Sequence, residues 1–295
     1  MGFITKLIIN LLSGLSLGSI YALIALGYTM VYGIAKMLNF AHGDIIMAGA
    51  FSIIVFVATC GLPPIIAIIL GIIFSMLLGI TVEFLAYRPL RKASPLSVLI
   101  TAIGVSYLLQ NLAQLIFGTS DIAFPTIYIN TEYMIGSIKI ELTTIITVLV
   151  TALIMVVLSL FISKSRTGKA MRAVSEDKDA AELMGINVNR TISITFAIGS
   201  GLAAVAGLFY GIDIGFVGAT TGAMPGIKAF VAAVFGGIGS IPGAMLGGIL
   251  LGVIENLAKL YISTELSDAV VFGVLILVLI IKPTGLLGKK ISEKV

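Results

Sequence analysis

The stretch LIINLLSGLSLGSIYALIALGYTMVYG, residues 7–33, carries no charged side chain over 27 residues. About 20 apolar residues in a helix are enough to cross the roughly 30 Å hydrocarbon core of a bilayer. Similar runs recur along the chain, which is 59% hydrophobic and only 11% charged, whereas soluble domains carry roughly 25% charged residues. Because the runs are continuous rather than alternating, we expect membrane-spanning helices and not a barrel.

The whole chain, residues 1–295, is predicted to be a single all-α transmembrane domain, a polytopic helical bundle. The candidate spans lie at residues 7–33, 37–60, 62–86, 96–117, 141–162, 191–211, 227–240, 244–262 and 268–281. The two weakest are 37–60, which contains the polar sequence NFAHGD, and 227–240, which is short. Either can be a re-entrant or broken helix, so eight and nine full spans both stay open.

Basic residues in short loops favour the cytoplasmic side of a membrane. Three such clusters occur: Arg88, Arg91 and Lys92; the segment 164–172; and the closing stretch 282–294. Two predicted spans separate the first cluster from the second and four separate the second from the third, so all three can lie in the cytoplasm. The loop 118–139 then lies outside. This topology accounts for the net charge of +4, so the lipid bilayer is the expected partner and a nucleic acid is not.

One dense polar segment interrupts the apolar chain, SKSRTGKAMRAVSEDKDAAELMGINVNR at residues 163–190, and it holds ten of the 32 charged residues. Residues 167–185 are predicted to form one short cytoplasmic helix. Arg172 with Glu176 and Lys178 with Glu182 have the i,i+4 spacing of helical ion pairs, and Gly185 stands where a helix would end. A solvated loop is the alternative interpretation. The ordered pattern closed by glycine favours a docking element for a soluble partner.

Polar groups inside spans are costly and point to function. Asn39, His42 and Asp44, in the sequence LNFAHGD, could line a pore or relay protons. They could also mark the start of a helix near the cytoplasmic surface, with Asn39 as its cap and Asp44 near its positive end.

Two further polar groups lie toward the outer ends of predicted spans. Glu255 and Lys259 have the spacing and order of a favourable helical ion pair, and we expect them to neutralise each other. Gln110, Asn111 and Gln114 either line an exit or hydrogen-bond across helices.

The glycines suggest close helix packing and one helix break. Small residues recur every four positions in GLSLG (14–18), in GAMLG and GILLG (243–252), and at Gly199, Ala203 and Gly207, a spacing that lets helix backbones approach closely. The sequence GGIGSIPG, residues 236–243, predicts an interruption, because glycine adopts backbone shapes closed to other residues and proline cannot continue a helix. The candidate break or pore-lining residues are Gly236, Gly239, Pro242 and Gly243.

No pattern of an enzyme is present in the sequence. TGKA and LGKK lack the first glycine and the hydroxyl residue of a phosphate-binding loop. A single histidine cannot build a zinc-binding HExxH motif, and a single cysteine, Cys60, excludes a cysteine-based metal cluster. We therefore expect no catalytic residue, no metal site and no cofactor of the chain's own, and energy for any work must come from elsewhere.

Several stretches resemble one family in order and nearly end to end. DAAELMG, residues 179–185, is similar to the cytoplasmic loop by which permeases of ABC importers dock their ATPase, although the Ile-x-Leu-Pro that usually follows is absent. The wider chain resembles the branched-chain amino-acid permeases of the Liv type, and the first of their two permease subunits rather than its partner. The resemblance rests on five stretches: GSIYALIALGYTMVYGIAKMLNFAHGD, AYRPLRK, RTGKAMRAVSEDKDAAELMGIN, KAFVAAVFGGIGSIPGAMLGG and KPTGLLG.

The resemblance implies a multi-pass subunit of a heteromeric importer in the cell (inner) membrane of a prokaryote. Its partners would be a second permease subunit, two cytoplasmic ATPases that bind ATP, and an extracytoplasmic binding protein that delivers leucine, isoleucine or valine. Residues 163–190 would be the coupling loop, and the residues that it implies for coupling to the ATPase are Arg172, Glu176, Asp179, Ala180, Ala181 and Gly185. The alternative is a secondary transporter or channel for a small apolar solute, which would need Asn39, His42 and Asp44 at the middle of the bilayer.

Overall fold

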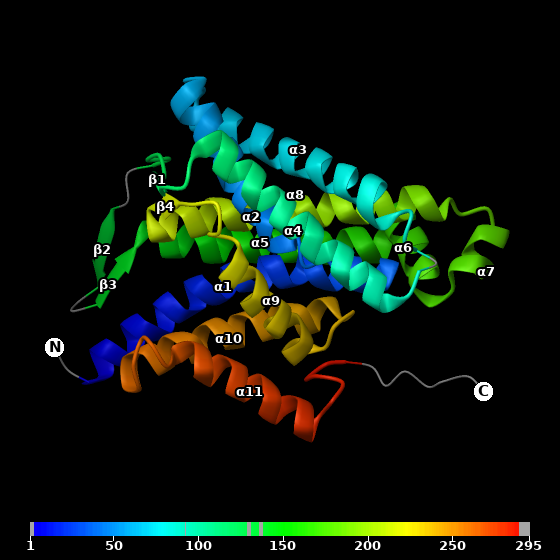
Figure 1. The fold of residues 1–295 in the computed structure, drawn as a ribbon. Coiled ribbons are helices and arrows are strands. Elements are labelled where there is room, and N and C mark those ends of the chain that lie inside the picture. The colour runs from blue at the N-terminus through cyan, green and yellow to red at the C-terminus, as the bar shows by residue number, and fades with distance from the viewer. Residues whose placement is uncertain (1–2, 92, 129–130, 136–137, 289–295) are drawn as a thin grey trace. The chain divides into compact units, whose positions relative to one another are not determined.

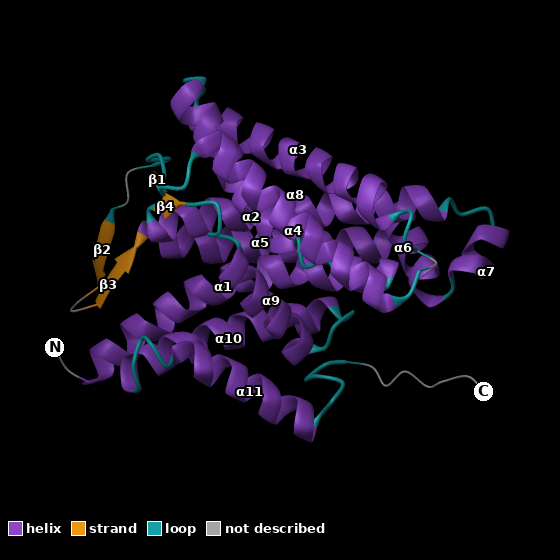
Figure 2. Cartoon of the chain, viewed as in Figure 1, coloured by secondary structure: helices purple, strands orange, loops and turns teal. Residues whose placement is uncertain are grey.

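The chain is a helical membrane protein, as predicted (Figure 1). The computed structural model describes residues 3–288 except 92, 129–130 and 136–137. Lys92, which belongs to the first basic cluster, and the tail 289–295 therefore lie outside the described residues. Figure 2 shows how little of the chain is strand. The helical segments are α1 (Phe3–Ala35), α2 (His42–Ile54) with the π-helical η1 (Val55–Thr59), α3 (Pro64–Val82) with the π-helical η2 (Glu83–Tyr87), α4 (Pro95–Phe117), α5 (Leu142–Lys164), α6 (Arg166–Glu176), α7 (Lys178–Leu183), α8 (Val188–Ile214), α9 (Ala223–Gly236), α10 (Ile241–Tyr261) and α11 (Ser267–Ile281).

Within the described residues, seven helical segments are long and apolar enough to cross a membrane: α1, α2 with η1, α3 with η2, α4, α5, α8 and α10. The helices α9 and α11 are apolar but only 14 and 15 residues long, shorter than the roughly 17 residues that a crossing needs. The two uncertain spans are both helical, although α2 begins only at His42 and α9 ends at Gly236. The number of crossings therefore stays a prediction.

Local sequence fixes where the long helices begin and end. The α4 helix follows Ser94, whose side chain accepts a hydrogen bond from the backbone N–H of Ser97, and it starts with a proline. The α8 helix follows Asn187, whose side chain accepts from the N–H of Arg190 at 2.9 Å. Both helices end at a glycine with positive φ, Gly118 and Gly215. Side-chain caps and glycine stops of this kind satisfy backbone groups that a helix end leaves unpaired.

The contacts divide the chain into two compact units. The first unit comprises Met1–Thr29, Asn130–Met155 and Lys228–Val295, and the second comprises Met30–Ile129 and Val156–Ile227. The helices α1, α5 and α9 pass from one unit into the other.

The second unit is built around α8, against which α2 and α3 pack. The packing is close because small residues face one another. A Cβ added at Gly49 would stand 2.7 Å from the Cα of Ala204, and one at Gly207 would collide with the backbone carbonyl of Ile46. The predicted small-residue face of α8 is thus used for backbone-to-backbone packing, which is the way membrane helices associate without a hydrophobic driving force.

The two ends of the second unit differ in character (Figure 1). At one end the short strands β1 (Ile122–Ala123) and β4 (Phe216–Val217) pair antiparallel. At the other end lie the polar helices α6 and α7. The side chain of Arg91, from a predicted cytoplasmic loop, and that of Lys178 in α7 are near enough to interact electrostatically. The loop that holds Arg91 and the helix α7, which follows the second basic cluster, therefore lie at the same end of this unit, as the predicted topology requires.

In the first unit, α1 and α10 cross at facing glycines. A Cβ at Gly14 would stand 2.9 Å from the Cα of Val253, and one at Gly248 or Gly252 would collide with the backbone of α1. The α11 helix packs on α10. The strands β2 (Glu132–Ile135) and β3 (Ile138–Glu141) pair antiparallel and lie mostly within the predicted outer loop 118–139.

Candidate functional site

The polar segment after α5 is anchored to its own chain by a tight turn. Ser165 accepts a hydrogen bond from the N–H of Gly168 at 2.9 Å and so caps α6. A Cβ at Gly168 would stand 2.5 Å from the Cα of Ile162, so the turn admits only glycine there. Gly168, Met171 and Val174 are buried, and their spacing places them on one face. The α6 helix therefore packs on the protein through one apolar face and leaves its charged face exposed.

The prediction of one helix over 167–185 is wrong, because the segment forms two helices joined at Asp177. Asp177 is extended, with φ −153° and ψ 117°. Its carboxylate accepts hydrogen bonds from the backbone N–H groups of Asp179 at 2.9 Å and Ala180 at 3.0 Å, which makes it the N-cap of α7. Short Asp side chains that bond to a nearby backbone favour this break over a continuous helix. The predicted stop is present, since Gly185 has φ +80° directly after α7.

The two predicted ion pairs of this segment do not form within the described residues. Arg172 instead donates to the carbonyl oxygen of Ser163 at 2.9 Å, and Lys178 donates to that of Ala35 at 2.8 Å. Both acceptors lie in the last turns of long helices, α5 and α1, where carbonyl groups lack helical partners and carry partial negative charge. We infer that these carbonyl groups bind the two cations more favourably than exposed carboxylates on the same helix, because exposed ion pairs contribute little stabilising free energy.

The ammonium group of Lys178 is partly withdrawn from water. Burial lowers the pKa of Lys178 below the ordinary value of 10.5, and the positive charges of Arg91 and Lys36 lower this pKa further, while Asp179 opposes the shift. Three cations thus gather where α7 meets the end of α1. The hydrogen bond to Ala35 holds one of them in place.

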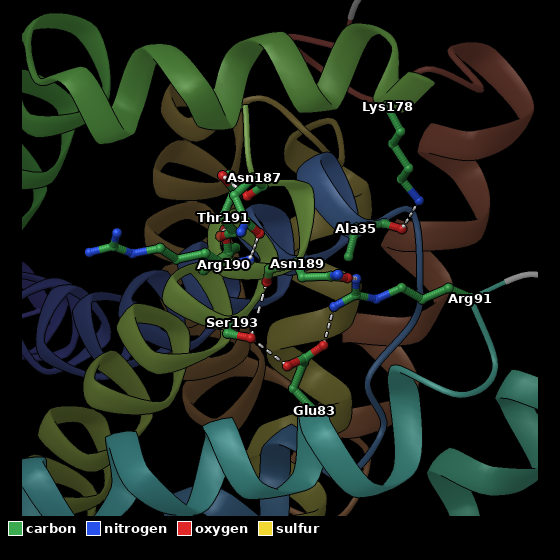
Figure 3. A network of polar contacts seen from close by, with 10 residues as sticks. Ala35, Glu83, Arg91, Lys178, Asn187, Asn189, Arg190, Thr191 and Ser193 are labelled. Atoms are coloured by element: carbon green, nitrogen blue, oxygen red, sulfur yellow. Dashed lines mark hydrogen bonds and ion pairs between the residues drawn. The ribbon is translucent and has the colours of Figure 1, made fainter. Parts of the chain in front are cut away.

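A second polar network lies beside this contact and joins α3 to α8 (Figure 3). Glu83, fully buried in η2, accepts from the guanidinium of Arg91 and from the hydroxyl of Ser193 at 2.6 Å. The same guanidinium donates to the side chain of Asn189. A buried carboxylate needs such partners to offset its lost hydration. The network fixes the loop after α3 against the first turns of α8, which directly follows the coupling segment.

The predicted coupling residues are mostly on the surface of the segment. The exposed members are Arg172, Glu176, Asp179, Ala180 and Gly185. Ala181 is buried, so its side chain contacts this chain and offers little to a partner. Two residues outside the predicted set stand out instead: Leu183 is 89% exposed and Met184 is 82% exposed. Large apolar side chains on a polar helix outside the membrane suggest a contact surface.

The three polar residues of LNFAHGD have different surroundings in the structure. Asn39 does not cap α2, because its side-chain oxygen accepts from the hydroxyl of Tyr87 at 2.8 Å and the residue before α2 is Ala41. His42 is the first residue of α2 and is buried. Asp44 lies in the first turn, as predicted, and accepts from the side-chain amide of Gln110 at 2.8 Å.

The partner of Asp44 places the start of α2 beside a part of α4 that is far from the first turn of α4. Gln110 lies 15 residues beyond Pro95 in α4, which is about 22 Å along a helix that rises 1.5 Å per residue. Asn39 in contrast contacts Tyr87, the last residue of η2. Asn39 and Asp44 therefore bind to different parts of the second unit, and their pore-lining role stays a prediction.

The glycine-rich stretch 236–243 interrupts the helices in the first unit. The α9 helix ends at Gly236 and α10 begins at Ile241, and Gly237 and Gly239 between them have φ of 111° and 89°. Gly236 and Gly243 touch through their backbones, while Pro242 lies in the first turn of α10, where a proline is tolerated. The C-terminal stretch adds hydrogen bonds from the N–H of Leu286 to Phe235 at 2.9 Å and of Leu287 to Gly236 at 2.8 Å.

The first unit contains a buried ion network, of which the sequence predicted only one pair. Glu255 pairs with Lys259 at 2.8 Å, as its spacing indicates. It also accepts from Lys228 of α9 at 2.9 Å and from the hydroxyl of Tyr21 of α1 at 2.9 Å. Lys228 reaches Asp268 of α11 at 2.6 Å. The sequence does carry a sign of these partners, because α9 and α11 are apolar helices that each contain one charged residue, Lys228 and Asp268.

Comparisons with known proteins identify the family of the chain. Residues 10–279 match the family model described as branched-chain amino acid transport system / permease component. The chain is 46% identical over 299 residues to the high-affinity branched-chain amino acid transport system permease protein LivH of Salmonella typhimurium, covering 97% of each chain. LivH of Escherichia coli is 45% identical and BraD of Pseudomonas aeruginosa, which has the same description, is 46% identical, each again over 97% of both chains. A family match over most of the chain, with relatives this similar from end to end, shows that the protein belongs to the family of branched-chain amino acid transport system permease components.

Proposed function

We propose that this chain is the membrane-spanning permease subunit of an ATP-driven importer of branched-chain amino acids. The observation that carries the proposal is the 46% identity to LivH over 97% of both chains. The chain would bind no ATP and no other cofactor itself, since ATP would be hydrolysed on partner subunits. The spans carry few charges, which suits an apolar zwitterionic solute better than an ion.

The partners that we propose are a second permease subunit, two cytoplasmic ATPases and an extracytoplasmic binding protein. Two features support ATPase docking on α6 and α7. Leu183 and Met184 are almost fully exposed, and a soluble partner could bury them. The buried face of α6 and the contact of Lys178 with Ala35 hold the segment against the long helices, so movement of a docked partner would be passed into the bundle.

Reconstitution of the complete complex in proteoliposomes tests this function. Leucine, isoleucine and valine uptake is measured with the binding protein outside and ATP on the ATPase side. We expect uptake that requires both the binding protein and ATP. The relative uptake rates of leucine, isoleucine and valine will show which amino acid is preferred. Uptake that persists without ATP or ATPases would contradict the proposal and would support a secondary transporter or channel instead.

A pair of variants tests the docking surface separately. Leu183→Glu with Met184→Glu introduces charge where we expect an apolar contact, and it should reduce ATPase co-purification and uptake together. Lys169→Gln, an exposed change on α6, is the matched control. Wild-type co-purification of the double variant would show that the ATPase binds elsewhere.

A further inference from the structure

The outer part of α4 has a polar face that is only partly packed and lies apart from the docking segment. Tyr107, Gln110, Asn111 and Gln114 are spaced at i, i+3, i+4 and i+7, which places them on one side of the helix. Tyr107 is 63% exposed, Asn111 is exposed, and the two glutamines are half-buried. The remaining sides of α4 are apolar: one packs into the second unit through Val98, Ala102 and Ala113, and the other exposes Leu108, Leu112 and Ile116.

This polar face begins in the middle of the span. Tyr107 lies 12 residues beyond Pro95 and 10 before Phe117, or about 18 Å and 15 Å from the two ends. Exposed tyrosine normally lies at the membrane–water interface, and amide side chains normally face water or protein rather than hydrocarbon. On the cytoplasmic half of α4 the same side carries the exposed apolar residues Ile100 and Ile103. The polar surface therefore extends from the middle of α4 toward its predicted outer end and does not continue into the other half of the helix.

The amide groups on this face present oxygen atoms. The side-chain nitrogen of Gln110 donates to Asp44 at 2.8 Å and to the hydroxyl of Ser106 at 3.3 Å, and that of Asn111 donates to the carbonyl of Tyr107 at 2.7 Å. In the described part of the chain, the side-chain oxygens of Gln110 and Asn111 accept no hydrogen bond. Asp44, 2% exposed, stands behind Gln110 and forms no ion pair with a described residue.

We propose that Tyr107, Gln110, Asn111 and Gln114 line a water-filled solute path in the outer half of the subunit, and that their oxygen atoms bind the ammonium group of an amino acid. The ammonium group is a cation with three N–H donors and complements amide oxygens backed by a carboxyl group. This assignment of the solute rests on the proposed function. Asp44 acts through Gln110, whose amide it orients, and is a positioning residue.

Thiol accessibility tests the path without relying on transport. In a Cys60→Ser background, single cysteines replace Asn111, Gln114, Leu108 and Ile116 in the reconstituted complex, and a charged, water-soluble methanethiosulfonate reagent is added outside. The thiolate is the reactive form and requires water, so we expect reaction at 111 and 114 to be at least about tenfold faster than at the apolar control positions 108 and 116. Equal rates at all four positions would overturn the proposal. No reaction at 111 and 114 in the complex, with fast reaction in the isolated subunit, would also overturn it and assign the face to the second permease subunit.

Two further arms test the ammonium site. Leucine should slow the reaction of Gln114→Cys, whereas 4-methylpentanoate, which lacks the ammonium group, should not; equal protection or none would refute ammonium recognition. Asn111→Leu should lower leucine uptake at least about tenfold through loss of the acceptor, with assembly kept, while Leu108→Ala should not. If the wild-type complex moves no branched-chain amino acid, the proposed function fails, and the labelling pattern still decides the aqueous path by itself.

Discussion

The ammonium group of Lys178 donates a hydrogen bond of 2.8 Å to the carbonyl oxygen of Ala35, although 143 residues separate the two in sequence. Lys178 opens α7 and Ala35 closes α1, so the contact joins the proposed docking segment to a 33-residue helix that enters both units. A movement of α7 would act directly on the end of α1. Coupling of two sites needs a physical connection of this kind, whose position both sites can bias.

Lys178→Met should weaken coupling while leaving the ATPase bound. A hydrogen bond of a charged group contributes about 1.5–3 kcal/mol, and the lower value corresponds to roughly a tenfold change in a coupled equilibrium. We expect the ratio of amino acid moved to ATP hydrolysed to fall by about that factor. Lys169→Met, on the exposed face of α6, should leave the ratio unchanged. Loss of ATPase co-purification in Lys178→Met would instead make Lys178 part of the docking surface.

The pH dependence of stability should also reveal Lys178. Burial, followed by Arg91 and Lys36, lowers the folded-state pKa of Lys178 below 10.5, so the folded protein releases this proton at a lower pH than the unfolded chain does. In the window between the folded-state pKa and 10.5 the unfolded state binds more protons, and stability rises with pH. The melting temperature of the wild type relative to that of Lys178→Met should therefore increase as the pH rises toward 10.5. A flat or falling difference would contradict the assigned shift.

The only cysteine of the sequence provides a test of topology. Cys60 is exposed and directly follows η1, at the end of its span away from the basic loops. A membrane-impermeant maleimide should label wild-type protein from outside in intact cells, and Cys60→Ser should abolish the labelling. Lys169→Cys in that background should react only after the membrane is opened. Labelling of residue 169 in intact cells would invert the predicted orientation.

The spans were predictable because each is a continuous apolar run, and such runs have few alternatives in a bilayer. The pairing of Glu255 with Lys259 and the stop at Gly185 were predictable for a related reason, since both depend on neighbours within one or two helical turns. The break at Asp177 has a local cause as well, but the same residues also fit a continuous helix. The capping bonds of its carboxylate, at 2.9 and 3.0 Å, distinguish the two outcomes only in the structure.

The remaining contacts could not be predicted because their partners are distant in sequence. The guanidinium of Arg91 donates to the side chain of Asn189, which is 98 residues away. Lys178 was predicted to pair with Glu182 at i,i+4, but it binds a helix-terminal carbonyl. The choice of partner depends on which helix ends come together, and no spacing along the chain encodes that.

Glu255→Gln should strongly destabilise the protein. Glu255 is 1% exposed and accepts hydrogen bonds from Lys228, Lys259 and Tyr21. Removing one partner of a buried ionic network leaves uncompensated charge and costs about 3–5 kcal/mol. We expect a large fall in the melting temperature of the purified complex. Glu132→Gln, which breaks the exposed pair with Lys139, should have no measurable effect. Equal effects of the two variants would show that the buried network is not needed for stability.

Gly239→Leu should abolish uptake while leaving insertion and assembly largely intact. Gly239 has φ +89° in the turn between α9 and α10, a conformation that costs a residue with a side chain about 1–2 kcal/mol. The strain would shift a turn that touches the C-terminal stretch through Leu286 and Leu287, and we predict that this turn moves or lines the path during transport. Gly273→Leu in α11 is the matched control, because Gly273 has no heavy atom within 4 Å of an added Cβ. Leucine uptake in proteoliposomes and co-purification of the partner subunits should be measured for both variants. Wild-type uptake by Gly239→Leu would remove the turn from the mechanism, and equal losses in both variants would point to a general intolerance of bulk in this unit.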